Sequence, residues 1–277
     1  MAGTGKEIRL KRLIDETGVS IICALDHGMT SPKFLKGLAD TRARSREAIA
    51  GGANCFMLGR NMVKLCVPEF RKDTALAFML SAAAAICPEF NWITEVATVD
   101  EALHFGADAV VVYVALGTSR DEEMLHFVAR VGAECEAKGI PFIAEAEFPT
   151  AYMPQGRLHD KYGTDYLVYS SRICAELGAD IVKTNWPGSQ KEFKKIINAI
   201  PVPVVIAGGS RVSDQELLTR MEQGMEAGAI GCSVGRNIFE HQNPEAMTRA
   251  LSRVIRERWK AKVAYKELKE SLNLIVA

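Results

Sequence analysis

Apolar, β-branched stretches recur along the chain, and four of them follow a helix-like segment that ends in Gly-Ala. The junctions are Gly52-Ala53, Gly106-Ala107, Gly178-Ala179 and Gly228-Ala229. Glycine ends helices because it readily adopts the positive φ found just beyond a helix C-terminus. The apolar stretch after each junction is typical of a strand buried on both faces of a parallel sheet.

The same pattern predicts eight strands. They are Ser20–Leu25, Cys55–Leu58, Ala75–Ser81, Ala109–Leu116, Pro141–Phe148, Asp180–Thr184, Val202–Ala207 and Gly231–Val234. Helices are expected in most gaps. The gap after the third strand is atypical, because it predicts a loop followed by a short helix at Val99–Phe105. A last amphipathic helix is expected from about Pro244 to Leu272.

Helix starts are also marked in the sequence. Three pairs have the capping-box spacing: Thr98 with Glu101, Ser119 with Glu122, and Ser213 with Glu216. In this motif the first side chain accepts a hydrogen bond from the backbone N–H of the second residue. We therefore expect a helix to begin just after each of Thr98, Ser119 and Ser213.

Alternating strands and helices suit either a closed barrel or an open doubly wound sheet. The length of 277 residues suits a barrel, which typically has roughly 250. No Gly-x-Gly-x-x-Gly follows the first strand, which disfavours a dinucleotide-binding sheet. No Pro-, Gly- or Ser-rich linker divides the chain. We predict an α/β fold, one (β/α)8 TIM barrel domain over residues 1–277 with a C-terminal helical extension.

Charge balance, the length of the apolar stretches and the cysteine pattern limit which partners and cellular compartment the chain is expected to have. Lys+Arg and Asp+Glu are both 34, and this balance argues against nucleic acid or an anionic membrane surface as the main partner. The longest apolar stretch, Ala75–Cys87, is shorter than the about 20 residues of a membrane span. The seven cysteines are odd in number and form no Cys-x-x-Cys pair. We expect buried free thiols and a cytoplasmic protein.

Lys183 is the strongest candidate for chemistry. Active sites of such barrels lie at the carboxyl ends of the strands, and Lys183 lies in the sixth predicted strand, close to that end. A lysine inside a barrel is costly unless it is paired or deprotonated. Burial favours the neutral amine, which is the form that attacks a carbonyl group. The alternative is a structural lysine that is bound to a carboxylate.

Other strand ends offer groups that could assist Lys183. Asp26 ends the first strand and could move protons, hold Lys183 in place or cap the next loop. His27 could be a proton shuttle or a hydrogen-bonded structural histidine. Gly208-Gly209 and Gly235-Arg236 follow the last two strands, where many barrels bind phosphate through backbone N–H groups. The scattered histidines have no metal-ligand spacing, and we expect neither a metal nor another cofactor.

Four segments at strand ends resemble the archaeal-type class I fructose-bisphosphate aldolase family. They are Ala24-Leu25-Asp26-His27-Gly28, Gly178-Ala179-Asp180-Ile181-Val182-Lys183-Thr184, Val204-Val205-Ile206-Ala207-Gly208-Gly209 and Val234-Gly235-Arg236-Asn237-Ile238-Phe239. This family includes 2-amino-3,7-dideoxy-D-threo-hept-6-ulosonate synthase and the thiolase that acts on phosphorylated autoinducer-2. The resemblance covers nearly the whole chain and identifies the family rather than the member.

The resemblance implies a Schiff base on Lys183 and a catalytic role for Asp26. It implies phosphate binding by the two glycine sites, and substrate contacts from the loop after the first strand. The residues concerned are Gly208, Gly209, Gly235 and Arg236 for phosphate, and His27, Gly28, Met29 and Thr30 for the loop. It also implies a ring-like homo-oligomer, often a decamer.

One position departs from the family pattern. Many members carry Tyr-Pro-Arg-Gly after the fifth strand, and that tyrosine is the acid/base. Matching the prolines puts Phe148 in its place here, and phenylalanine cannot transfer a proton. Counting back from Lys183 favours Tyr152, whereas counting forward along the strand gives Glu147. Both stay candidates for the proton donor.

The sequence therefore predicts a Schiff-base-forming class I aldolase for a small phosphorylated keto sugar, of the dihydroxyacetone phosphate or fructose 1,6-bisphosphate type. A transaldolase-like synthase and a coenzyme A-dependent thiolase on the same scaffold are alternatives. A non-catalytic phosphate-binding barrel or an isomerase would leave Lys183 without a purpose.

Overall fold

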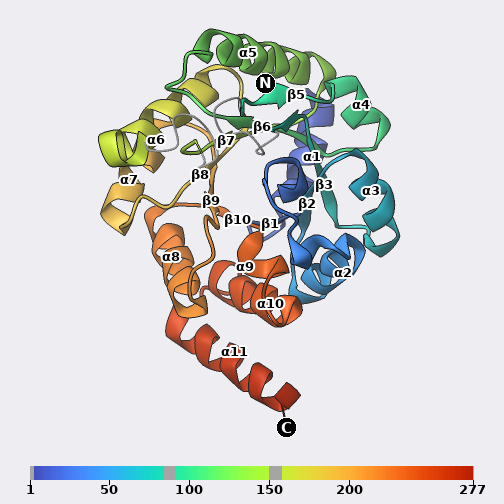
Figure 1. Ribbon diagram of the computed structural model, residues 1–277, viewed down its shortest axis with the longest axis vertical. Helices are drawn as coiled ribbons and strands as arrows, with labels where there is room; N and C mark the ends of the chain where they lie inside the picture. The colour runs from blue at the N-terminus through green and yellow to red at the C-terminus, as the bar shows by residue number, and fades with distance from the viewer. Residues whose placement is uncertain (1–2, 84–90, 150–157, 277) are drawn as a thin grey trace.

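The computed structural model describes residues 3–83, 91–149 and 158–276. Eight parallel strands close into a barrel in the order β1-β10-β9-β8-β7-β6-β3-β2 (Figure 1). They are β1 (Ser20–Ala24), β2 (Cys55–Leu58), β3 (Ala75–Met79), β6 (Ala109–Val114), β7 (Phe142–Ala146), β8 (Ile181–Thr184), β9 (Val204–Ala207) and β10 (Gly231–Val234). Each lies within a predicted strand, and the predicted (β/α)8 fold is confirmed.

Helices surround the barrel and join its strands. They are α1 (Thr4–Leu13), α2 (Thr41–Gly51), α3 (Arg60–Cys66), α4 (Val99–His104), α5 (Asp121–Lys138), α6 (Leu158–Glu176), α7 (Gln190–Ala199), α8 (Asp214–Ala227), α9 (Arg236–Phe239), α10 (Pro244–Ile255) and α11 (Ala261–Val276). The 3-10 turns are η1 (His27–Met29), η2 (Lys36–Leu38) and η3 (Val67–Glu69). A small antiparallel pair, β4 (Ser81–Ala82) and β5 (Thr94–Glu95), follows β3.

The glycine junctions have the expected backbone conformation. Gly52, Gly106, Gly178 and Gly228 have φ of 104°, 75°, 103° and 115°. An L-residue with a side chain rarely adopts these angles, so glycine lets the chain leave each helix and enter the next strand without strain.

Two of the three predicted caps are present. The side chain of Thr98 accepts a hydrogen bond from Glu101 N, and that of Ser213 accepts one from Glu216 N. The prediction at Ser119 is wrong, because α5 begins at Asp121 and Ser119 caps nothing. The Asp121 carboxylate instead accepts hydrogen bonds from Gly117 N and Thr118 N, so it organises the approach to α5 itself.

The long C-terminal helix of the prediction is two helices. The chain turns between α10 and α11 at Arg258, whose φ is 59°. The α11 start is then fixed from α8, where Glu222 Oε2 accepts a hydrogen bond from Ala261 N at 2.7 Å. Because this contact is tertiary, the local amphipathic pattern could not reveal the break. Figure 1 shows α11 reaching away from the barrel beside α8 and α10.

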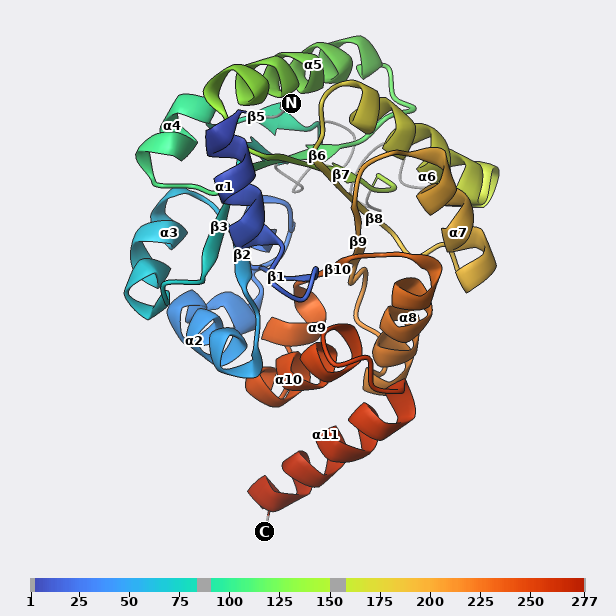
Figure 2. The ribbon, with the colours of Figure 1, turned by 180° about the vertical axis from the view of Figure 1, so that it is seen from behind.

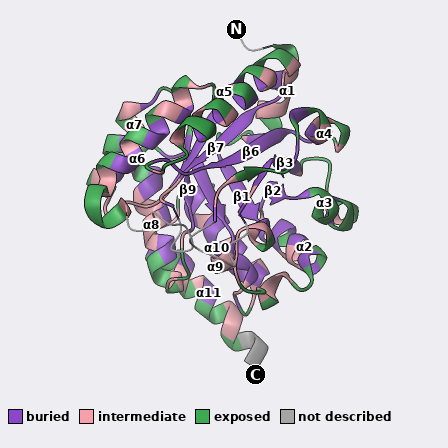
Figure 3. Ribbon diagram, turned by 45° about the horizontal axis from the view of Figure 1, so that its top comes forward, coloured by how far each residue is buried: buried purple, intermediate pink, exposed green. Residues whose placement is uncertain are grey.

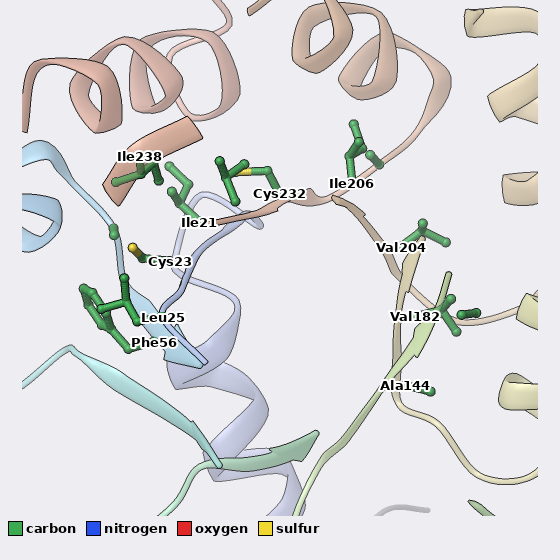
Figure 4. Packing of buried hydrophobic residues seen from close by; sticks show 14 of the residues in the cluster. Ile21, Cys23, Leu25, Phe56, Ala144, Val182, Val204, Ile206, Cys232 and Ile238 are labelled. Carbon is green, nitrogen blue, oxygen red and sulfur yellow. The ribbon is translucent and has the colours of Figure 1, made fainter. Parts of the chain in front are cut away.

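Alternate strand residues build two apolar cores, because successive side chains of a strand point to opposite faces. The outer core lies between strands and helices and includes Ile21, Phe56, Val182, Ile206 and Cys232 (Figure 4). The inner core fills the barrel itself. It is formed by Leu13, Ile22, Ala24, Cys55, Met57, Ala75, Ala77, Met79, Ala109, Val111, Ile143, Ile181 and Val205. Figure 3 shows the strands as a continuous buried centre within partly exposed helices.

The amino end of the barrel is closed by α1, which lies across the strands in the view of Figure 2. Leu13 of α1 joins the inner core. Buried Lys6 anchors the same helix, because its Nζ lies 2.7 Å from Glu136 Oε2 and 3.1 Å from Asp180 Oδ2. The six described cysteines are buried free thiols, as predicted. No helix in the described ranges is long and apolar enough to cross a membrane.

Candidate functional site

Charged side chains replace apolar ones at the carboxyl end of the inner core. Ile143 and Ile181 belong to that core, and Glu145 and Lys183 lie two residues farther along the same strands. Because side-chain direction repeats every two residues in a strand, Glu145 and Lys183 also face inward. The barrel interior is thus apolar toward the amino ends of the strands and charged at their carboxyl ends.

A cavity of about 120 Å³ opens at this end. It is lined by Asp26, His27, Thr30, Ser31, Leu35, Tyr113, Glu145, Glu147, Lys183 and Arg236. Larger hollows lie elsewhere, and one of about 250 Å³ is lined by residues that include Trp92, Ala115 and Phe127. We place the candidate site in the smaller cavity because it contains the buried lysine.

Lys183 is paired rather than isolated. Glu145 is its partner in the register of β7 and β8, and Lys183 Nζ donates a hydrogen bond to Glu145 Oε1. Glu147 Oε1 lies 3.0 Å from the same nitrogen. Only 9% of the Lys183 side chain and 3% of the Glu145 side chain are exposed, so both charges are held almost without water.

The charges of the pair depend on each other. Burial alone would lower the pKa of Lys183, but Glu145, Glu147 and Asp26 outweigh it and raise that pKa above its usual value. Burial raises the pKa of Glu145 to about 7, although Lys183 opposes the shift. The resting amine is therefore protonated. The nearest group able to take its proton near neutral pH is Glu145.

Glu147 is held by its surroundings from the opposite side. Asn185 Nδ2 donates to Glu147 Oε2 at 3.1 Å, and Asn185 Oδ1 accepts from Phe148 N at 2.8 Å. The Tyr113 hydroxyl donates to Phe148 O at 2.7 Å. Burial raises the pKa of Tyr113 well above its usual value, so this hydroxyl stays protonated.

Asp26 and His27 face the cavity from the end of β1. Within the described residues Asp26 Oδ1 has no hydrogen-bond partner, and it lies 3.8 Å from His27 Nδ1. Burial lowers the pKa of His27 despite the nearby Asp26 carboxylate, so the ring is neutral at pH 7. The ring packs edge-on against Phe239 with centroids 5.2 Å apart. His27 is thus fixed as part of the wall.

The structure brings some predicted site residues into the cavity and leaves others outside it. Asp26, His27, Thr30, Glu147, Lys183 and Arg236 line the cavity. Gly28, Met29, Gly208, Gly209 and Gly235 lie at the same end of the barrel but outside this lining. Gly235 is closely packed, since a Cβ there would meet His27 Cε1 at 2.3 Å.

The two candidates for the proton donor differ in what the structure describes. Glu147 lies in the cavity. Tyr152 lies outside the described residues. Phe148, which the proline match puts in the tyrosine's place, stacks on Tyr166 with ring centroids 5.0 Å apart. Phe148 thus packs away from Lys183, whereas the residue before it, Glu147, contacts the Lys183 amine.

Glu145 and Tyr113 are cavity residues that the sequence interpretation did not single out. The signal for Glu145 was present, because a carboxylate inside an apolar strand is as unusual as a lysine there. Tyr113 gives no such signal, since aromatic residues are common in strands. Its place in the wall depends on the closure of the barrel.

Comparison with known proteins agrees with this geometry. A model of the DeoC/LacD family aldolases matches residues 20–241. The 2-amino-3,7-dideoxy-D-threo-hept-6-ulosonate synthase of Halobacterium salinarum is 32% identical over 257 residues, which cover 93% of this chain and 94% of that protein. Synthase 1 of Archaeoglobus fulgidus is 30% identical over 251 residues, 91% of each chain. A solved structure of a Schiff-base-forming fructose-1,6-bisphosphate aldolase has a TM-score of 0.80 at 25% identity, covering 91% of this chain and 100% of that one.

Proposed function

The chain belongs to the DeoC/LacD family of aldolases, and from this premise we propose that it is a Schiff-base-forming class I aldolase for a small phosphorylated keto sugar. The observation that supports the proposal most directly is the buried Lys183 amine, which faces a cavity between the carboxylates of Glu145 and Glu147.

The pair can produce the nucleophile within the cavity. Proton transfer from Lys183 to Glu145 leaves a neutral amine beside a neutral acid. The amine attacks the substrate carbonyl carbon, a C–N bond forms, and the oxygen takes up a proton. This first proton comes from the attacking nitrogen. Glu145 then returns its proton to the hydroxyl group, water leaves, and the iminium ion forms.

Cleavage follows from the iminium ion. A carboxylate removes the proton of the β-hydroxyl group, the Cα–Cβ bond breaks, and its electron pair moves to the iminium nitrogen. An aldehyde leaves and an enamine stays on Lys183. Protonation of the enamine carbon and hydrolysis release the ketone and restore the lysine. We assign the proton transfers to Asp26 and Glu147, since both line the cavity; Tyr152 stays a candidate from the sequence.

Phosphate would be held by Arg236 and the glycine turns. Arg236 lines the cavity, and no group in the described ranges accepts a hydrogen bond from its Nε. A guanidinium forms strong charge-assisted hydrogen bonds to phosphate. Gly208, Gly209 and Gly235 follow the neighbouring strands β9 and β10, so their backbone could approach the same anion.

A second candidate is a transaldolase-like synthase, which is favoured by the two relatives with that name. It would use the same iminium ion but pass the enamine to an aldehyde such as aspartate semialdehyde. Product that forms only when this acceptor is added would identify the synthase. Coenzyme A stimulation would identify a thiolase instead.

Borohydride trapping tests the Schiff base. The protein is incubated with dihydroxyacetone phosphate or fructose 1,6-bisphosphate, reduced, digested and mapped by mass. We expect the adduct on the Lys183 peptide in the wild type and none in Lys183→Ala, with exposed Lys191 unmodified in both. Adducts with other phosphorylated ketones alone would change the substrate. No adduct with any carbonyl compound would refute the mechanism.

A further inference from the structure

Two cross-strand pairs follow one another at the ends of β7 and β8. The register pairs Glu145 with Lys183 and Ala146 with Thr184. One step farther, beyond the last residues of the strands, Glu147 meets Asn185. Glu147 lines the same cavity as Glu145 and Lys183, and Asn185 contacts it from the chain just after β8.

Asn185 binds Glu147 in one orientation only. Its Oδ1 accepts the backbone N–H of Phe148 at 2.8 Å, and a backbone N–H can only donate. The other end of the amide is therefore the NH₂ group, which donates to Glu147 Oε2 at 3.1 Å. One amide thus fixes both the carboxylate and the chain that carries it.

This arrangement leaves the second carboxylate oxygen available. Glu147 Oε1 points to Lys183 Nζ at 3.0 Å and has no aligned hydrogen bond from any described residue. The backbone of the segment has a further anchor, because Tyr113 OH donates a hydrogen bond to Phe148 O at 2.7 Å. Asn185 also binds this backbone through Phe148 N, and its further contribution is the hydrogen bond to the Glu147 carboxylate.

Glu147 needs such a partner more than Glu145 does. Glu145 lies inside β7 and is bound directly by Lys183. Glu147 lies past the end of β7, and 14% of its side chain is exposed, so its rotamers have more freedom. An acid/base group must be held close to its proton donor or acceptor to be effective.

We propose that Asn185 is a positioning residue that presents Glu147 Oε1 for proton exchange with the substrate bound to Lys183. The role rests on the proposed aldolase function. Asn185 acts through Glu147 and does not itself transfer a proton. The ionisable groups that line the cavity with Glu147 are Asp26 and His27 after β1, Tyr113 of β6, Glu145 of β7, Lys183 of β8 and Arg236 of α9.

Two variants separate the contacts of Asn185. Asn185→Asp keeps the acceptor for Phe148 N but loses the donor to Glu147, whereas Asn185→Ala loses both. In each we expect kcat to fall about tenfold to a hundredfold with KM little changed. Asn198→Asp, at an exposed position of α7, is the matched control.

A double-mutant cycle with Glu147→Gln tests whether the effect passes through Glu147. In that background, replacing Asn185 should cost less than about twofold more. Wild-type kcat in Asn185→Asp would overturn the proposal, as would an equal cost in both backgrounds. Borohydride trapping on Lys183 in the same variants separates the two hypotheses. A trapped imine with an unaffected Asn185→Asp refutes only the role of Asn185, whereas no imine in the wild type refutes the aldolase mechanism and this role with it.

Discussion

Replacing Glu145 by glutamine should lower the pKa of Lys183. The change removes the carboxylate that lies opposite Lys183 in the register and keeps the side-chain shape. Two unit charges about 4 Å apart attract by about 4 kcal/mol at an effective dielectric constant of about 20. This energy corresponds to about three pKa units. Burial, which lowers the pKa of Lys183, would then be opposed chiefly by Glu147 and Asp26.

Carbamylation by cyanate measures this shift, because only the neutral amine reacts. The extent of Lys183 modification is followed by peptide mapping over a range of pH. Exposed Lys191 in the same digest is the reference amine that reports the reactivity of the reagent at each pH. We expect the Lys183 midpoint to fall by about three units in Glu145→Gln and to stay in place in Glu176→Gln, an exposed residue of α6. A midpoint that is unchanged or higher in Glu145→Gln would show that Glu145 does not hold the proton on Lys183.

Three further predictions concern Lys6, Gly231 and Arg236. Lys6→Met should lower the free energy of unfolding by about 2 kcal/mol in urea denaturation, because the partly buried Asp180 carboxylate loses its cationic partner. The change at the exposed partner, Glu136→Gln, should cost less than about 1 kcal/mol, and equal costs would argue against the contact with Asp180 as the cause. Gly231→Ala should lower the free energy of unfolding by about 3 kcal/mol or prevent folding, because the added Cβ would lie 1.8 Å from Ser20 O, where β10 pairs with β1. An unchanged melting temperature would contradict this packing. Arg236→Gln should raise the KM for a phosphorylated ketose about tenfold to a hundredfold, because charge-assisted hydrogen bonds to the phosphate are lost. An equal rise in KM for the unphosphorylated ketose would exclude phosphate as the group that Arg236 binds.

Local patterns in the sequence were sufficient to predict the strands and to single out Lys183. Strands buried on both faces of a parallel sheet have continuous apolar sequences. The four glycines that precede such strands have positive φ angles, which other residues rarely adopt. Lys183 stands out for the same reason, since a charge inside such a run is costly unless it has a function or a partner. These patterns involve only residues close together in the sequence, so they can be recognised without knowledge of the fold.

The partners of Lys183 were decided by the tertiary structure alone. Glu145 lies 38 positions from Lys183, and the two meet because barrel closure fixes the register of β7 against β8. That register brings Glu145 to Lys183, and the neighbouring carboxylates raise the pKa of Lys183, which burial by itself would lower. Just beyond the strand ends, Glu147 meets Asn185. The break between α10 and α11 has a similar origin, since Glu222 of α8 fixes the start of α11. Sequence spacing records which side chains share a face of one strand, but the alignment of different strands and helices is a property of the whole packed chain.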